Sequence, residues 1–246
     1  MTPSYPHAPI TEAIIEIKFA TPLDPSDVDK INEKFGAYYP QHQNVETVDI
    51  NLNLTEIQSD KATAQLDRAV GHRRASVDMT ELLVIWRPAF VISQLAPYPG
   101  WDSFSQRFLR DWAVWKRVVG FREISRIGVR YMNRIDIPVA GPIVENEAFL
   151  NVYPKMPDVF GPLAAYAIQA VVPIEELGCK LTLNSGAIPS PILNHASFIL
   201  DQDIAKEIDP PQSDDAIYEL LSKIRIQKNK VFEACITDRA RELFNK

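Results

Sequence analysis

Apolar and polar residues alternate with a period of two along much of the chain. The longest such stretch runs from Ser125 to Pro138, where arginines stand between apolar side chains and Asn133 is the one amide in the apolar set. Successive side chains of a strand point to opposite faces of a sheet, so this pattern predicts a long strand with an apolar and a charged face. Alternation and short apolar runs predict further strands at Ala13 to Phe19, Val45 to Ile57, Lys61 to Val70, Arg73 to Met79, Leu82 to Trp86, Phe90 to Leu95, Leu163 to Pro173, Leu177 to Asn184 and Leu193 to Ala205.

Apolar residues at helical spacing predict three longer helices. The first begins at Asp24-Pro25, because aspartate caps a first turn and proline fits the first helical position. The second runs from Trp101 to Gly120 and has an aromatic face. The third is capped by Ser213. Two shorter helices are predicted at Glu145 to Tyr153 and after Thr237-Asp238.

The order of these elements predicts an α+β fold built on mostly antiparallel sheet, because strands follow one another in hairpin-like runs with few helices between them. Residues 1–138 form a strand-helix-strands-helix-strand unit. Residues 139–246 form a strands-helix unit packed on it, and the two are either separate domains or one continuous domain. The small-residue turn from Val139 to Pro142 is the expected boundary.

Composition narrows the class of protein. The formal net charge of −6 argues against general nucleic-acid binding, which needs a basic face. Cys179 and Cys235 are expected to be buried and unpaired, as in a reducing compartment. No export signal and no long apolar run is visible, so we predict a cytoplasmic protein that does not enter a membrane.

Three arginines, Arg126, Arg130 and Arg134, share the charged face of the long strand, and Glu16 and Lys18 share one parity of the first strand. If these strands are neighbours, their charged faces coincide, and we expect Glu16 to lie within salt-bridge reach of Arg130. Such a face is either a cross-strand ion-pair ladder or a basic concavity that binds a phosphorylated or carboxylated ligand. Both alternatives stay open at this point.

The loop from Tyr98 to Trp101 offers two aromatic side chains in a proline-stiffened frame, and such residues often anchor interfaces. We expect Tyr98 or Trp101 to contact a protein partner, with a homodimer as the default. The sequence therefore favours a non-catalytic binding or regulatory protein that recognises a protein partner or an anionic ligand through the arginine-lined face. The predicted binding residues are Glu16, Lys18, Arg126, Arg130, Asn133, Arg134, Tyr98 and Trp101.

Signatures of common catalytic sites are missing from the sequence. It has no P-loop, dinucleotide glycine fingerprint or nucleophile elbow. The four histidines have no metal-ligand spacing with each other or with the cysteines. We predict no cofactor and no bound metal.

Several motifs resemble one bacterial family. The stretch Ile127-Gly128-Val129-Arg130-Tyr131-Met132-Asn133-Arg134-Ile135 is similar to the Arg-Tyr-x-Asn-Arg hallmark of the "sporadically distributed protein" family. The Tyr98-Pro99 turn, the Leu200-Asp201-x-Asp203 strand and the segment from Phe232 to Asp238 are similar as well, so the resemblance spans essentially the whole chain. Arg225 stands where this resemblance would place a histidine, which argues against a catalytic imidazole there. The family has no established activity, so the resemblance implies no mechanism.

A second, shorter resemblance gives the alternative function. Glu16-Ile17-Lys18 resembles half of the Glu-x-Glu-x-Lys opening of triphosphate tunnel enzymes, although Ile14 replaces the first glutamate. This resemblance implies a metal-dependent phosphohydrolase with Mg²⁺ between Glu16, Asp201 and Asp203.

Overall fold

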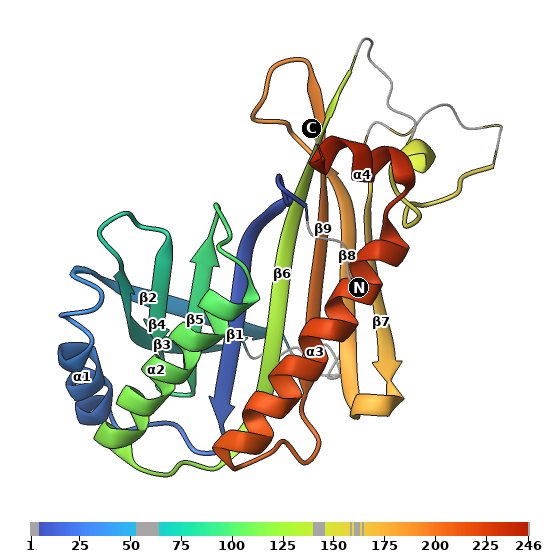
Figure 1. Ribbon diagram of the computed structural model, residues 1–246. Helices are drawn as coiled ribbons and strands as arrows, with labels where there is room; N and C mark the ends of the chain where they lie inside the picture. The colour runs from blue at the N-terminus through green and yellow to red at the C-terminus, as the bar shows by residue number, and fades with distance from the viewer. Residues whose placement is uncertain are drawn as a thin grey trace.

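The computed structural model of the chain describes residues 5–52, 64–139, 146–157, 159, 163 and 165–245, with the backbone alone for 47–52 and 64–70. Within these residues, nine strands form one sheet in the order β2-β3-β4-β5-β1-β6-β9-β8-β7 (Figure 1). The strands are β1 (Ile10–Phe19), β2 (Gln41–Leu52), β3 (Ala64–Ala75), β4 (Glu81–Ile85), β5 (Ala89–Leu95), β6 (Ile124–Pro138), β7 (Ala167–Ile174), β8 (Cys179–Ile188) and β9 (His195–Lys206). The helices are α1 (Pro25–Lys34), α2 (Trp101–Val119), α3 (Asp214–Cys235) and α4 (Asp238–Phe244), with 3-10 turns η2 (Asn146–Ala148) and η3 (Glu175–Leu177).

Every pair of neighbouring strands is antiparallel, which confirms the predicted α+β fold class. The long strand β6 lies beside β1, the middle strand of the sheet. Val129 pairs with Ile15 of β1 along one edge and with Ile204 of β9 along the other. The sheet therefore runs without interruption from the first predicted unit into the second.

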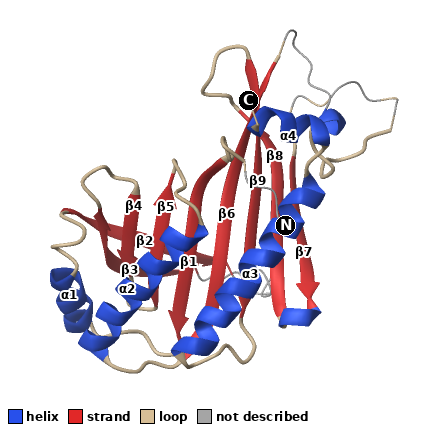
Figure 2. Ribbon diagram, viewed as in Figure 1, coloured by secondary structure: helices blue, strands red, loops and turns tan. Residues whose placement is uncertain are grey.

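Helices α1, α2 and α3 lie on one face of the sheet, and α4 follows α3 near one end of the central strands (Figure 2). The alternation of β1 and β6 turns their apolar residues toward these helices. Ile15, Val129, Trp115 of α2 and Leu221 of α3 are all fully buried. The aromatic face predicted for α2 lies in this core, where Trp112 and Trp115 stack with their ring centroids 4.9 Å apart. The core is therefore a single layer between the sheet and the helices.

The predicted break between two strands at residues 70–73 is wrong, because β3 continues through it. A Cβ atom at Gly71 would lie 2.6 Å from the backbone oxygen of Ile85 and would overlap the ring of Trp86. Glycine at this position therefore serves a close approach between β3 and the end of β4, and not a turn.

The helix predicted from Glu145 to Tyr153 is also wrong, since the described part of this segment forms only the 3-10 turn η2. Leu150 instead forms an antiparallel bridge with Ile236. The amide of Asn151 donates to the carbonyl of Cys235 at 2.8 Å. The backbone of Leu150 and Asn151 is thus hydrogen-bonded to the segment between α3 and α4, and not within a helix. The expected boundary turn from Val139 to Pro142 falls almost entirely outside the described residues, as do the ends of two predicted strands at 53–63.

Cys179 and Cys235 are both buried and free, as expected. Burial raises the pKa of the Cys235 thiol to about 11, which keeps it in the unreactive thiol form. Across the described helices, none is both long enough and apolar enough to span a bilayer.

Candidate functional site

The face of the sheet that the helices leave uncovered carries an ion-pair ladder across β1, β6 and β9. Arg126 donates to Glu16 on β1, and its Nη2 donates to Asp203 on β9 at 2.7 Å. Its Nε also lies 3.4 Å from a carboxylate oxygen of Glu207. The ammonium of Lys18 lies 3.9 Å from the Glu16 carboxylate. One guanidinium thus joins carboxylates from two neighbouring strands.

The expected ion pair between Glu16 and Arg130 is wrong, because Gly128 changes which arginine reaches the glutamate. Glu16 lies opposite Gly128 in the register of β1 and β6. A Cβ atom at Gly128 would clash with the guanidinium of Arg126, whose Cζ lies 2.8 Å from that position. The missing side chain leaves room for Arg126 to fold back along the strand and meet Glu16.

Arg130 and Arg134 have other partners. Arg130 forms a bidentate pair with Asp201 of β9, with both N–O distances at 2.7 Å, and Asn184 of β8 donates to the same carboxylate at 2.9 Å. Arg134 pairs with Asp136 at 3.1 Å. All three arginines of the predicted binding face therefore meet a carboxylate, which is the arrangement expected of a ladder.

The two ends of the Arg130–Asp201 pair differ in burial, which gives a directional prediction. The Asp201 side chain is 5% exposed and that of Arg130 is 42% exposed. Arg130→Ala would leave a buried carboxylate without its cation, whereas Asp201→Asn would leave a guanidinium that can turn to water. We expect Arg130→Ala to lower the free energy of unfolding by about 1 kcal/mol and Asp201→Asn to lower it less. Urea unfolding of both variants checks this order, and an equal or larger loss in Asp201→Asn would contradict it.

The carboxylates named for the alternative function already hold arginines. Asp201 holds Arg130, while Glu16 and Asp203 share Arg126. Among the described residues, no group of three or more histidine, cysteine, aspartate and glutamate side chains could hold a metal ion.

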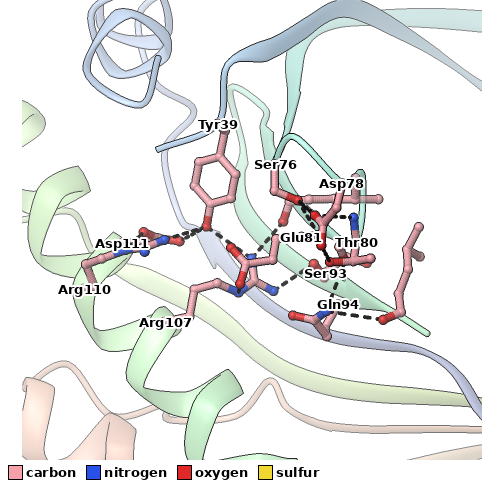
Figure 3. Close-up of polar contacts among 12 residues, drawn as sticks. Tyr39, Ser76, Asp78, Thr80, Glu81, Ser93, Gln94, Arg107, Arg110 and Asp111 are labelled. Atoms are coloured by element: carbon pink, nitrogen blue, oxygen red, sulfur yellow. Dashed lines mark hydrogen bonds and ion pairs between the residues drawn. The ribbon is translucent and has the colours of Figure 1, made fainter. Parts of the chain in front are cut away.

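A second polar cluster is buried between α2 and the sheet, and the sequence analysis did not identify it. Asp111 of α2 is fully buried, accepts a hydrogen bond from the Tyr39 hydroxyl and pairs with Nε of Arg110 at 2.8 Å. Arg107 donates to the Tyr39 hydroxyl at 3.1 Å and to the carbonyl of Ser93 at 2.8 Å. Figure 3 shows these α2 side chains converging on Tyr39. Desolvation, reinforced by Asp111, raises the pKa of Tyr39 well above its ordinary value, so the phenol stays a donor. The cluster fixes α2 on the sheet.

A pocket of about 360 Å³ lies on the helix side of the sheet, between α3, β6 and the loop that precedes α2. We call it the lysine pocket, after Lys228. Three of the predicted binding residues, Tyr98, Trp101 and Asn133, contribute to its wall. Trp101 is only 6% exposed, so it forms a pocket wall and not a protruding anchor. The lining residues are Tyr5, Ala8, Pro9, Ile10, Tyr98, Pro99, Gly100, Trp101, Tyr131, Asn133, Arg225, Lys228, Asn229 and Phe232.

Local sequence explains how these side chains meet. Arg225, Lys228 and Phe232 are three and four positions apart on α3, so they share one side of the helix. Tyr131 and Asn133 are two positions apart on β6, so both point to the helix face of the sheet. Tyr98 is half-buried, and its hydroxyl lies 2.9 Å from that of Tyr131.

Lys228 is the most unusual group in the lysine pocket. It is 8% exposed, and its ammonium lies 3.9 Å from the centroid of the Tyr131 ring. It makes no hydrogen bond and no ion pair with any residue that the structure describes. Burial, reinforced by the charge of Arg225, lowers the pKa of Lys228 from 10.5 to about 8. At neutral pH the pocket therefore contains a mostly protonated, buried cation, whose charge Glu233 favours although the two form no ion pair.

The rest of the lysine pocket adds positive charge and hydrogen-bond donors. Arg225 is exposed beside it, with Cζ 6.0 Å from the centroid of the Trp101 ring, and no carboxylate lines the pocket. Burial raises the pKa of Tyr98 to about 12 and that of Tyr131 well above 10, so both hydroxyls stay protonated. Aromatic walls, two cations and two hydroxyls together suit a small anion with an apolar body.

A signal for this site was present in the sequence. Ile224, Lys228 and Phe232 follow one another at four-residue spacing, and Ile224 and Phe232 belong to the predicted apolar stripe of α3. A lysine inside an apolar stripe is either a surface side chain at the edge of the stripe or a buried cation. Only the three-dimensional structure, in which β6 and the loop at Tyr98 lie next to Lys228, shows that this lysine is a buried cation.

Comparisons with known proteins identify no family. No family model matches the sequence, and neither does any curated protein. Of the solved structures, that of the S. pombe Pct1 RNA triphosphatase in complex with the Spt5 CTD is 9% identical over 92% of this chain and 86% of that chain, with a TM-score of 0.18. Another structure of S. pombe Pct1 RNA triphosphatase is 8% identical over 98% of this chain and 82% of that chain, with a TM-score of 0.15. Scores this low establish no common fold.

Proposed function

We propose that the protein is a binding protein for a small organic anion, which it holds in the lysine pocket. The observation that carries this proposal is Lys228, a buried cation that lines a cavity and forms no ion pair with a described residue, while the nearby Glu233 carboxylate is paired with Arg241. An unpaired buried charge costs several kcal/mol, so a ligand carboxylate or phosphate would gain affinity by supplying the missing partner.

The shape of the lysine pocket narrows the ligand class. Trp101, Tyr131 and Phe232 offer aromatic surface, which favours a flat or apolar body. Arg225 also lines the pocket, as a second cation whose planar guanidinium suits a carboxylate or phosphate. The ligand we propose is therefore an aromatic or otherwise apolar compound that carries one carboxylate or phosphate.

Two further predictions remain as proposals beside this one. Membership in the sporadically distributed family rests on the motifs of β6 and of the segment from Phe232 to Asp238, and it adds no activity. Contact with a protein partner or a second copy of the chain through Tyr98 is to be checked by light scattering, where a monomer mass at micromolar concentrations would contradict a homodimer.

Anion binding can be tested with simple probes. Benzoate and phenyl phosphate are expected to raise the melting temperature, whereas benzamide, the neutral isostere of benzoate, should not. At a tenfold excess over Kd the stabilisation would be about 1.4 kcal/mol, or roughly 3 °C for a chain of this size. Lys228→Met and Arg225→Gln should each reduce the shift.

The matched control for these variants is Lys230→Gln, which removes one exposed positive charge from the same helix outside the pocket lining. It should retain the full anion-dependent shift. The proposal fails if neither anion stabilises the protein more than benzamide does. It also fails if Lys230→Gln loses as much of the shift as Lys228→Met.

A further inference from the structure

We propose that Lys228 is an amine nucleophile that forms a reversible imine with an aldehyde or ketone carrying a phosphate or carboxylate group. This inference rests on the proposed function, because the anionic group of the ligand is what brings its carbonyl into the lysine pocket. It adds a covalent step and narrows the ligand to an anionic carbonyl compound.

The surroundings of Lys228 are those that a reactive lysine needs. Its side chain leaves α3 within the lysine pocket and reaches the face of the Tyr131 ring, with the nitrogen 3.9 Å from the ring centroid. No carboxylate lines the pocket, and the one nearby carboxylate that favours the protonated amine, Glu233, is paired with Arg241 at 2.9 Å. Two other lysines of α3 provide the contrast: Lys223 pairs with Glu219 at 2.7 Å, and Lys230 is exposed.

The fraction of neutral amine follows from this burial. With the pKa of Lys228 lowered by burial to about 8, roughly a tenth of the side chain is neutral at pH 7. An exposed lysine with an ordinary pKa is neutral in less than roughly a thousandth of molecules at that pH. A desolvated lysine of this kind is a recognised nucleophile toward carbonyl carbon.

The proposed step balances without any further reactant. The nitrogen lone pair of neutral Lys228 attacks the carbonyl carbon, a C–N bond forms and the C=O π electrons move to oxygen. A proton moves from nitrogen to that oxygen and gives a carbinolamine. Cleavage of its C–O bond, with transfer of the second nitrogen proton to the departing hydroxide, yields the imine and one water molecule.

Other pocket residues have defined tasks in this step. Arg225 beside the pocket would hold the phosphate or carboxylate, which leaves the carbonyl to point toward Lys228. The Tyr98 and Tyr131 hydroxyls are both protonated at neutral pH and lie 2.9 Å apart, so one donates to the other and the remaining proton can be donated to the carbinolamine oxygen. These three residues position the ligand, and Lys228 alone forms the covalent bond.

Pyridoxal 5′-phosphate is a suitable chemical probe, because it joins an aldehyde, a phosphate and an aromatic ring in one molecule. The folded protein is incubated briefly with it, reduced with borohydride and mapped by peptide mass spectrometry. We expect modification of Lys228 to be at least ~10-fold faster than that of Lys223, which is paired with Glu219, or of the exposed Lys230, because the Lys228 amine is desolvated. Arg225→Gln should slow the labelling of Lys228, and phenyl phosphate should compete with it. Equal or slower labelling of Lys228 than of the two surface lysines overturns the inference.

A second probe separates this inference from the proposed function. Pyridoxine 5′-phosphate has the same phosphate and ring but no carbonyl, so thermal stabilisation by it reports anion binding alone. Stabilisation without a Lys228 adduct overturns the imine and leaves the binding function standing. Absence of both stabilisation and adduct overturns both proposals. Lys228→Arg cannot form an imine and should show no adduct at position 228.

Discussion

An Asp111→Ala variant is expected to lose about 3–5 kcal/mol of its free energy of unfolding, which is typical for removal of one member of a buried charge cluster. Asp111 is fully buried and holds both the Tyr39 hydroxyl and Arg110. Arg110 is 40% exposed and can turn to water when its partner is lost. Arg107, whose side chain is 5% exposed, keeps its ion pair with Glu81 at 3.9 Å. The cost therefore comes from the loss of the buried, charged acceptor that the Tyr39 hydroxyl and Arg110 share.

Urea unfolding followed by circular dichroism would measure this loss. Tyr39→Phe removes only the hydroxyl and should cost about 1–2 kcal/mol, well below the loss in Asp111→Ala. Asp238→Ala is the surface control, because the Asp238 side chain is 97% exposed although it pairs with Arg241 at 2.7 Å. It should leave the midpoint unchanged. A midpoint for Asp111→Ala within error of that control would show that the cluster does not hold α2 on the sheet.

The second large effect that we expect is a gain in stability. Lys228→Met is expected to raise the free energy of unfolding at pH 7 by about 2 kcal/mol. A pKa lowered by burial from 10.5 to about 8 corresponds to a cost of roughly 3 kcal/mol for holding the protonated amine in the fold. Methionine removes this cost but gives up the attraction between the ammonium and the Tyr131 ring, which is about 0.5–2 kcal/mol. A binding residue that destabilises the ligand-free fold fits the common conflict between activity and stability.

The gain should depend on pH in a defined direction. Below pH 8, Lys228 is protonated in both the folded and the unfolded chain, so the folded wild type is destabilised by the full cost of burying the charged amine. Between pH 8 and 10.5 the unfolded chain binds the proton and the folded chain does not, so wild-type stability rises with pH relative to the variant. Above 10.5 the difference due to protonation vanishes. Unfolding free energies of both proteins at pH 7, 9 and 10.5 measure this trend, and a constant difference across the range would contradict it.

Most of the fold was predictable because it depends on local patterns. Strict alternation in β1 and β6 identified both strands and the face that each would bury. The stop of α2 at Gly120 followed from a glycine that adopts a φ of 70°, a left-handed conformation that other residues avoid. The errors arose where a distant segment decided the local structure. Gly71 lies within a strand because the ring of Trp86 leaves no room for a side chain there. Leu150 is not helical because it pairs with Ile236.

The candidate site was predictable only in part, for the same reason. The alternation of β6 placed three arginines on one face of the sheet. It could not show that Gly128 leaves room for Arg126 to pair with Glu16. Tyr98, Trp101 and Asn133 were predicted as binding residues, the first two in a loop that contacts a partner and Asn133 on the long strand β6. Their common cavity depends on α3 crossing β6, and no pattern within either element reveals which helix lies over which strand.

The position of β6 beside the middle strand also has a consequence for how the chain acquires its structure. β1 pairs with β6 as well as with β5, and β6 pairs in turn with β9, so these contacts join segments that lie far apart in the sequence. Contacts between such distant segments are formed at a large cost in loop-closure entropy, which makes folding slow. The second edge of β6 can be paired only after β9 has been synthesised. Until then β6 presents an unpaired edge, which is a template for pairing with other chains.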